Sequence, residues 1–164
     1  MTEDLFHQDA YLRSCEAAVT GADEQGVRLD RTVFYASGGG QPGDIGHLRL
    51  PDGRMLQVTN TIYGMYKTDI VHVLAEDKAL PAIGAEVFCE IDWDRRYRLK
   101  RMHTCLHLLS VALPYAVTGG QVGPDEGRLD FDIPDAGLDK DEITERVNAL
   151  ISEDHPVRAR WITD

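Results

Sequence analysis

The chain of 164 residues has room for one domain of usual size or two small ones, and its 43% hydrophobic residues suffice for a core. A formal net charge of −11 argues against a protein that coats nucleic acid, and no apolar run approaches the roughly 20 residues of a membrane-spanning helix. The N-terminus lacks the features of a signal peptide, and the three widely spaced cysteines, Cys15, Cys89 and Cys105, favour a reducing cytoplasm.

Residues 1–93 consist largely of short alternating or β-branched runs bounded by turn residues. This spacing, with no intervening helix, predicts a small β-barrel or sandwich. His47 and His72 alternate with apolar neighbours, so we expect both on a polar face of a strand rather than at a metal. The predicted strands cover residues 11–19, 27–30, 32–35, 47–50, 55–59, 70–74 and 84–92.

A glycine-rich segment, residues 36–46, interrupts these strands. Gly38, Gly39 and Gly40 free the backbone for positive φ and let another group approach the main chain before Gln41. Bare N–H groups of such a loop can form a concavity that binds an anion. The segment matches neither of the common phosphate-binding glycine motifs and no helix follows it, so a wide β-turn is the simpler interpretation.

Near Trp93 the spacing of apolar residues changes from the alternation of a strand to the period of a helix. Residues 94–113 predict the longest amphipathic helix, with Asp94 as its N-cap and Tyr97 on the apolar stripe. His103 and His107 are four residues apart, so their side chains share one face at about 6 Å and can bind one divalent metal. They could equally be two ordinary helix histidines. Cys105 points elsewhere and is not counted as a ligand.

A basic cluster precedes the histidines on the same helix. On an acidic chain it suggests contact with an anionic ligand, although a solvated helix face paired with Asp92 and Asp94 remains an equal alternative. The cluster consists of Arg95, Arg96, Arg98, Lys100 and Arg101.

Residues 119–123 and 125–127 predict turns, 128–133 a strand, 138–153 a second amphipathic helix and 157–162 a final strand. These elements form an α+β unit. The predicted architecture is therefore α+β, with a small β-barrel at residues 1–93 and an α+β domain at residues 94–164.

Three motifs in this order resemble those of the stand-alone alanyl-tRNA editing proteins, the AlaX group, and the editing domain of alanyl-tRNA synthetase. The resemblance spans almost the whole chain. The motifs are the glycine-rich Phe34–Gly46 stretch, Asp92-Trp93 leading into the His103-Thr104-Cys105-Leu106-His107-Leu108-Leu109 segment, and Gln121-Val122-Gly123 followed by residues 128–132.

The resemblance implies a zinc-containing hydrolase that removes wrongly attached serine or glycine from alanine tRNA. His103 and His107 would be zinc ligands, and Gln121 and Thr104 would line the editing pocket and recognise a serine hydroxyl. The glycine motif, Gly38 to Gln41, would contact the substrate and discriminate against alanine. The acceptor end of the tRNA would be held through its phosphates by Arg96, Arg98, Lys100 and Arg101.

The sequence departs from the family pattern at the metal. The other two of the four expected zinc ligands come from a downstream Cys-x-x-x-His segment in the family, and this sequence has no cysteine after Cys105. His155 lacks a cysteine partner, so it is not counted as a zinc ligand. We expect a fragment of a longer protein rather than a protein that has lost its metal.

Two other functions stay open on the sequence. One is a non-catalytic module that binds tRNA or a protein. The other is a different metal hydrolase built on the histidine pair, although the glutamate of the His-Glu-x-x-His motif is absent.

Overall fold

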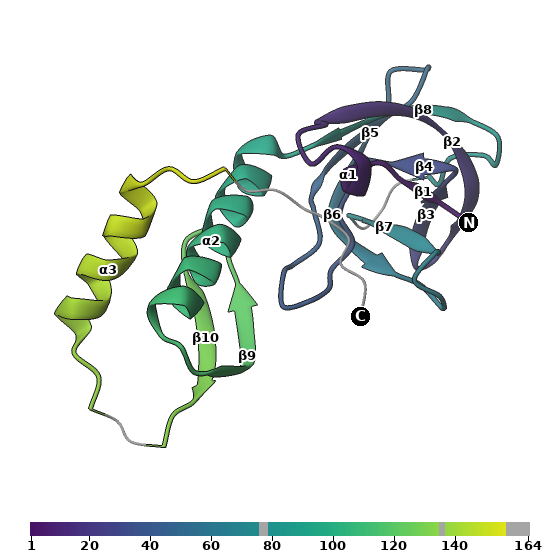
Figure 1. Cartoon of the computed structure of the whole chain (residues 1–164). Coiled ribbons are helices and arrows are strands. Elements are labelled where there is room, and N and C mark those ends of the chain that lie inside the picture. Colours follow the sequence, from purple (N-terminus) through teal and green to yellow (C-terminus); the bar gives the residue numbers. More distant parts are fainter. Residues whose placement is uncertain (76–78, 135–136, 157–164) are drawn as a thin grey trace.

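A computed structural model of the chain describes residues 1–75, 79–134 and 137–156. Six antiparallel strands close into a barrel in the order β2-β3-β7-β6-β5-β8 (Figure 1). The predicted α+β class with an N-terminal barrel is confirmed. The barrel strands are β2 (Ser14–Asp23), β3 (Gly26–Leu29), β5 (Gly46–Arg49), β6 (Met55–Tyr63), β7 (Ile70–Leu74) and β8 (Glu86–Ile91).

Alternating apolar side chains fill the barrel, because successive residues of a strand point to opposite faces. The β2–β8 pairing, with Ala17 opposite Val87, closes the cylinder, so these strands leave no free edge. The largest side chains of the core include Phe34, Leu29, Leu48 and Leu56, all almost completely buried. A small parallel pair, β1 (Glu3–Asp4) with β4 (Arg31–Thr32), and the short α1 (Leu5–Gln8) lie against the barrel.

His72 corrects one prediction about the barrel. Its side chain is fully buried instead of lying on a polar face. Its Nδ1 donates to the Val27 carbonyl at 2.9 Å, and the Thr32 hydroxyl donates to its Nε2 at 2.8 Å. Both ring nitrogens therefore have partners inside the core, while His47 is exposed as expected.

The second part of the molecule is built around the long helix α2 (Trp93–Ala112), which leads away from the barrel (Figure 1). The antiparallel strands β9 (Ala116–Val122) and β10 (Gly127–Asp132) contact one side of α2, and α3 (Lys140–Ser152) contacts another. Leu99, Leu106 and Val122 form a small core between the helix and the hairpin.

Four local predictions differ from this structure. Asp92 rather than Asp94 caps α2, because its side chain accepts the Arg95 amide at 3.0 Å. Tyr97 is 44% exposed and lies off the apolar stripe. Residues 119–122 belong to β9 instead of a turn, and β4 covers only the first of residues 32–35. The predicted strand at 157–162 lies outside the described residues.

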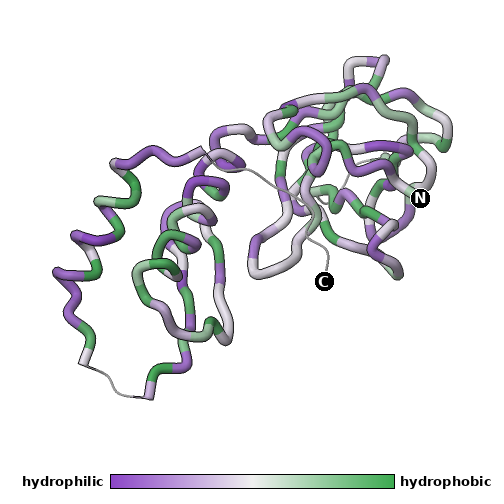
Figure 2. The backbone as a smooth tube through the Cα atoms, viewed as in Figure 1, coloured by the Kyte–Doolittle hydropathy of each residue, from purple (hydrophilic) through white to green (hydrophobic). Residues whose placement is uncertain are grey.

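Helix α3 has no buried side chain, and hydrophilic and hydrophobic residues alternate along it (Figure 2). Asp139 caps its N-terminus by accepting the amides of Asp141 and Glu142. No helix in the described part of the chain is both long enough and apolar enough to span a membrane.

Candidate functional site

His103 and His107 lie one turn apart on α2, and their rings stack with centroids 5.0 Å apart and planes 13° from parallel. His103 is half-buried and His107 is exposed. Burial lowers the pKa of His103, and the neighbouring His107 lowers this pKa further. His103 is therefore neutral at pH 7 and offers a nitrogen lone pair.

The glycine-rich loop of the barrel reaches this histidine pair. Gln41 is 7% exposed, and its Oε1 lies 3.0 Å from His103 Nδ1. With the amide oxygen facing the ring, Nδ1 carries the proton and donates it, which leaves the lone pair on Nε2. Gln41 thus selects the tautomer and the orientation of a potential ligand or base.

The loop has a defined conformation between Gly38 and Gln41. The amides of these two residues donate to each other's carbonyls, each at 3.0 Å, and the Tyr35 hydroxyl donates to the Gly38 carbonyl at 3.2 Å. Gly39 and Gly40 have φ of +58° and +79°, which L side chains rarely adopt. The segment therefore forms a turn, as the sequence predicted, but a tight one between Gly38 and Gln41 rather than a wide β-turn.

The tip of this loop also docks on β9. The Val122 amide donates to the Gly40 carbonyl at 2.8 Å. A Cβ atom at position 40 would lie 2.6 Å from the Gly120 carbonyl oxygen, so the two backbones approach closely because position 40 is glycine. The barrel loop, α2 and β9 therefore meet at one place.

A pocket of about 350 Å³ opens at this meeting point. The imidazoles stand on one side of it and the backbone of β9 on another, over an apolar floor. Gln121 is exposed and lines the pocket, while its role in editing stays a prediction. The lining residues are Gly39, His103, Leu106, His107, Ser110, Val117, Gly119, Gly120, Gln121, Val122 and Leu129.

Thr104 and most of the loop residues lie outside this lining. Thr104 is exposed, and its direction on α2 differs by about 100° from that of His103. Of the glycine motif, Gly39 lines the pocket, whereas Gln41 acts on it through His103. Contact between the substrate and these residues stays a prediction.

The basic cluster does not form one surface, and the structure corrects the role expected for Arg96. This guanidinium is 3% exposed, forms a close ion pair with Asp44 and donates to the Val33 carbonyl at 2.8 Å. It is therefore out of reach of a phosphate. Arg98 forms an exposed ion pair with Asp125 at 2.7 Å, and Arg101 is exposed.

Asp44 and Arg95 have a structural role at the site that the sequence did not predict, since Arg95 was assigned to the basic cluster and Asp44 only to the glycine-rich segment. Asp44 accepts the Tyr35 amide and the Arg96 guanidinium, and Arg95 donates to the Gly43 carbonyl at 2.9 Å. These bonds fix the glycine-rich loop to the first turn of α2. The single sequence signal was an acidic residue inside a glycine-rich segment that otherwise predicts a turn.

Two histidines are the potential metal ligands that the described residues bring together at this pocket. No group of three or more His, Cys, Asp or Glu side chains that could hold a metal gathers among residues 1–75, 79–134 and 137–156. The two imidazoles, one of them oriented by Gln41, stack face to face, so their in-plane lone pairs converge on one ion only after a ring turns. The described residues alone do not complete the coordination sphere of a metal ion.

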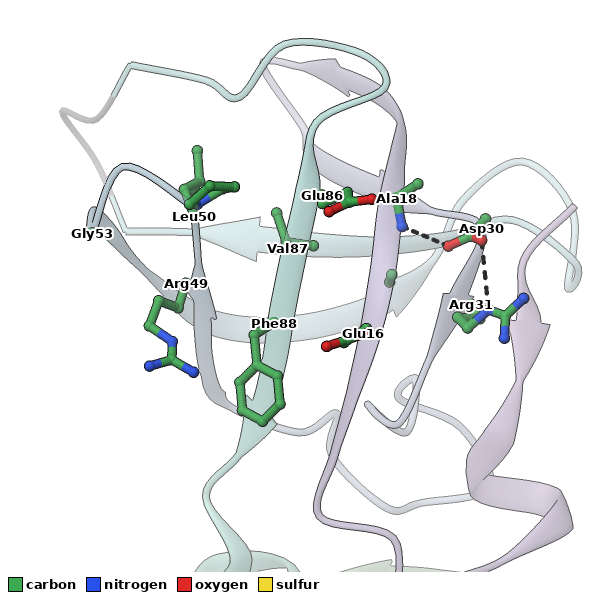
Figure 3. A pocket seen from close by; sticks show the side chains of 12 residues that line it. Glu16, Ala18, Asp30, Arg31, Arg49, Leu50, Gly53, Glu86, Val87 and Phe88 are labelled. Atoms are coloured by element: carbon green, nitrogen blue, oxygen red, sulfur yellow. Dashed lines mark hydrogen bonds and ion pairs between the residues drawn. The ribbon is translucent and has the colours of Figure 1, made fainter.

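A second hollow, of about 640 Å³, lies on the outside of the barrel over β2 and β8 (Figure 3). The two arginines that line it already have partners, since Arg49 stacks on Phe88 at 4.9 Å and Arg31 pairs with Asp30 at 3.5 Å. The candidate site is therefore the pocket beside the histidines.

A closed barrel whose glycine-rich loop docks on a histidine-bearing helix places the chain in a class of tRNA synthetase-related modules. Residues 8–95 match the family of class II (A) tRNA synthetases. The chain is 40% identical to the alanyl-tRNA editing protein AlaX-M of Methanosarcina acetivorans over 96% of its own length and 68% of that relative. It belongs to the alanyl-tRNA editing proteins of the AlaX-M type.

Two further relatives support this assignment. The chain is 32% identical to AlaX-M of Pyrococcus horikoshii, over 100% of this chain and 76% of that protein. It is 35% identical to an alanine–tRNA ligase of Saccharolobus islandicus, of which it spans 18%. The predicted family is confirmed.

Proposed function

We propose that the pocket between the glycine-rich loop, α2 and β9 hydrolyses the ester bond of alanine tRNA that carries serine or glycine. One observation supports this proposal: the three sequence motifs meet at that pocket. The Gln41–His103 hydrogen bond joins the glycine-rich loop to α2, and the Gly40–Val122 hydrogen bond joins it to β9. The volume of about 350 Å³ is within the range that binds small organic groups.

The chemistry requires little more than positioning. An aminoacyl ester is already activated, so holding its carbonyl beside a water can supply much of the rate. The neutral His103 has its Nε2 lone pair available to accept a hydrogen bond from that water or from the substrate amine, because Gln41 binds Nδ1. Gln121, at the pocket edge, would recognise the serine hydroxyl, which alanine lacks.

We further propose that His103 and His107 bind zinc once other ligands complete the site; His103 would then give its Nε2 lone pair to the ion instead of to the water or the amine. Zinc would lower the pKa of a bound water or orient the aminoacyl group. The free cysteines Cys15, Cys89 and Cys105 support a cytoplasmic location for this activity.

Deacylation of Ser-, Gly- and Ala-charged alanine tRNA by the full chain tests the proposal. We expect hydrolysis of the first two, with little hydrolysis of the third. His103→Ala and His107→Ala should each lower the rate at least tenfold, and His47→Ala, an exposed histidine on β5, is the matched control. Unchanged hydrolysis in both α2 variants would contradict the site.

A non-catalytic tRNA-binding module is the second candidate, because the described residues offer two metal ligands rather than four. The same assay separates the two functions. Specific binding of alanine tRNA without hydrolysis, also after addition of zinc, would favour the binding module.

A further inference from the structure

Aromatic and cationic side chains alternate where the N-terminal segment crosses the start of α2. We call this group the aromatic–cationic strip; it consists of Tyr11, Arg13, Trp93, Tyr97 and Lys100. Trp93 and Tyr97 stack with centroids 5.9 Å apart and planes 27° from parallel, and Tyr11 lies 5.9 Å from Trp93. The Arg13 guanidinium lies 4.5 Å over Trp93, and Lys100 Nζ lies 3.3 Å over Tyr11.

The outer rings of the strip do not belong to the core. Trp93 packs partly against the barrel interior, but Tyr11 is 64% and Tyr97 is 44% exposed. Grouped exposed rings on a folded protein indicate a binding surface. Base–aromatic stacking tolerates any sequence, because every nucleobase has a π face.

The cations of the strip are available to a polyanion. Arg13 is exposed, and so is Arg101, which follows the strip's Lys100 in the chain. Lys100 is half-buried; its ammonium group donates to the Ala10 carbonyl at 3.1 Å and faces the Tyr11 ring, which leaves one of its three donors. The overall charge of −11 makes this local basic group distinct from the rest of the surface.

The strip leads toward the pocket. Trp93, Tyr97, Lys100, Thr104 and His107 follow one another at spacings of four, three, four and three residues, so they lie on one face of α2. From Trp93 to His107 this face is roughly 21 Å long, about the axial length of six stacked nucleotides. That length suits the unpaired 3′ end of a tRNA and the first pairs of its stem.

We infer that the aromatic–cationic strip binds the unpaired 3′ nucleotides of the tRNA and guides the terminal ribose to the histidine pocket. The inference rests on the proposed function, because it takes tRNA as the partner. Bases stack on Tyr97 and Tyr11, while Arg13, Lys100 and Arg101 contact the phosphates. Thr104, which does not line the pocket, then lies on the path of the RNA strand along α2.

Binding of uncharged alanine tRNA to the full chain tests this surface without hydrolysis. Tyr97→Leu and Arg13→Gln are compared with wild type, using intact tRNA and tRNA that lacks its unpaired 3′ nucleotides. We expect Tyr97→Leu to weaken binding of intact tRNA on the order of 5- to 100-fold and to leave binding of the truncated tRNA unchanged. Arg13→Gln should act in the same direction with a smaller loss.

Tyr66→Leu and Arg54→Gln are matched controls, since Tyr66 is 68% exposed and Arg54 is exposed on the barrel, away from α2. Circular dichroism checks that all variants fold. The inference is overturned if wild type does not distinguish intact from truncated tRNA, or if Tyr97→Leu binds intact tRNA as wild type does. Strip-dependent binding without deacylation would contradict the proposed hydrolysis and leave the inference standing.

Discussion

Arg96 and Asp44 join the barrel to α2 through a buried ion pair. Both Asp44 oxygens accept from Arg96 Nε at 2.9 Å, and Asp44 also accepts the Tyr35 amide at 2.7 Å. The side chains are 4% and 1% exposed. A buried ion pair of this kind holds its geometry because every remaining donor and acceptor finds a partner.

Removing Arg96 should therefore be strongly destabilising. Arg96→Ala leaves the Asp44 carboxylate buried without its cation, and we expect the free energy of unfolding to fall by about 3–5 kcal/mol. Urea denaturation measures the loss. The control Arg54→Ala removes the exposed pair with Asp52, whose side chains are 47% and 53% exposed, and should cost below about 1 kcal/mol. Equal losses in the two variants would contradict the structural role of Arg96.

His72 makes stability depend on pH in a defined window. Desolvation lowers its pKa from the ordinary 6.5 to about 4, against a small opposing effect of the hydrogen bond to Val27. Between these two values the unfolded chain binds a proton and the folded chain does not. Stability is therefore full above about pH 6.5 and falls as the pH decreases toward 4, by roughly 3 kcal/mol.

Denaturant unfolding at pH 7.5, 6.0 and 4.5 measures this dependence. His103, whose pKa is also lowered, contributes in the same direction. The difference between wild type and His72→Gln isolates His72, since glutamine retains a donor and an acceptor but does not titrate. An unchanged slope of stability against pH in His72→Gln would contradict the assignment.

At the scale of elements, α2 was well predicted and β9 was missed. The apolar period and the proline after Leu113 define a 20-residue helix almost to the residue, because both signals are local. The Gly119-Gly120 pair of β9 predicts a turn, yet it pairs with β10 opposite Asp130 and Leu129. Glycine fits there because a Cβ at position 120 would lie 2.9 Å from the Leu129 side chain and 3.0 Å from the Arg128 carbonyl oxygen of β10, a cross-strand contact that no local pattern contains.

Contact between the glycine-rich loop and β9 depends on Gly40 more than on Gly39. Both residues have positive φ, so alanine strains either position by about 1–2 kcal/mol. Only the Cβ at position 40 would also meet the Gly120 carbonyl, at 2.6 Å, whereas the described residues leave the space at position 39 open to 4 Å. Gly40→Ala should therefore separate the loop from β9.

Hydrogen exchange of the Val122 amide, which donates to the Gly40 carbonyl, measures this separation. We expect at least tenfold faster exchange in Gly40→Ala and a much smaller change in Gly39→Ala. Equal exchange in both variants would show that strain alone, rather than the close backbone approach, determines the effect.

At the scale of the molecule, the sequence predicted the residues of the site better than their connections. His103, His107 and Gln121 were identified from a helical spacing and a motif, and they line one pocket. The sequence could not show that Arg96 of the basic cluster is buried whereas Arg98 is exposed. The two arginines are only two residues apart, but their ion-pair partners lie elsewhere in the chain. Arg96 pairs with the buried Asp44 and Arg98 with the exposed Asp125.

An acidic protein that binds tRNA through a short basic surface should show a weak dependence on salt. Arg13, Lys100 and Arg101 would neutralise about three phosphates, so log K should fall with log salt with a slope of roughly −2 to −3. Raising the salt from 50 to 200 mM would then weaken binding about 16- to 64-fold, where a protein with an extensive basic surface loses far more. Fluorescence titration of labelled tRNA over this range measures the slope, and Arg13→Gln should reduce its magnitude by somewhat less than about 1. A slope steeper than about −6 in wild type would require many more cationic contacts than α2 and the N-terminal segment provide.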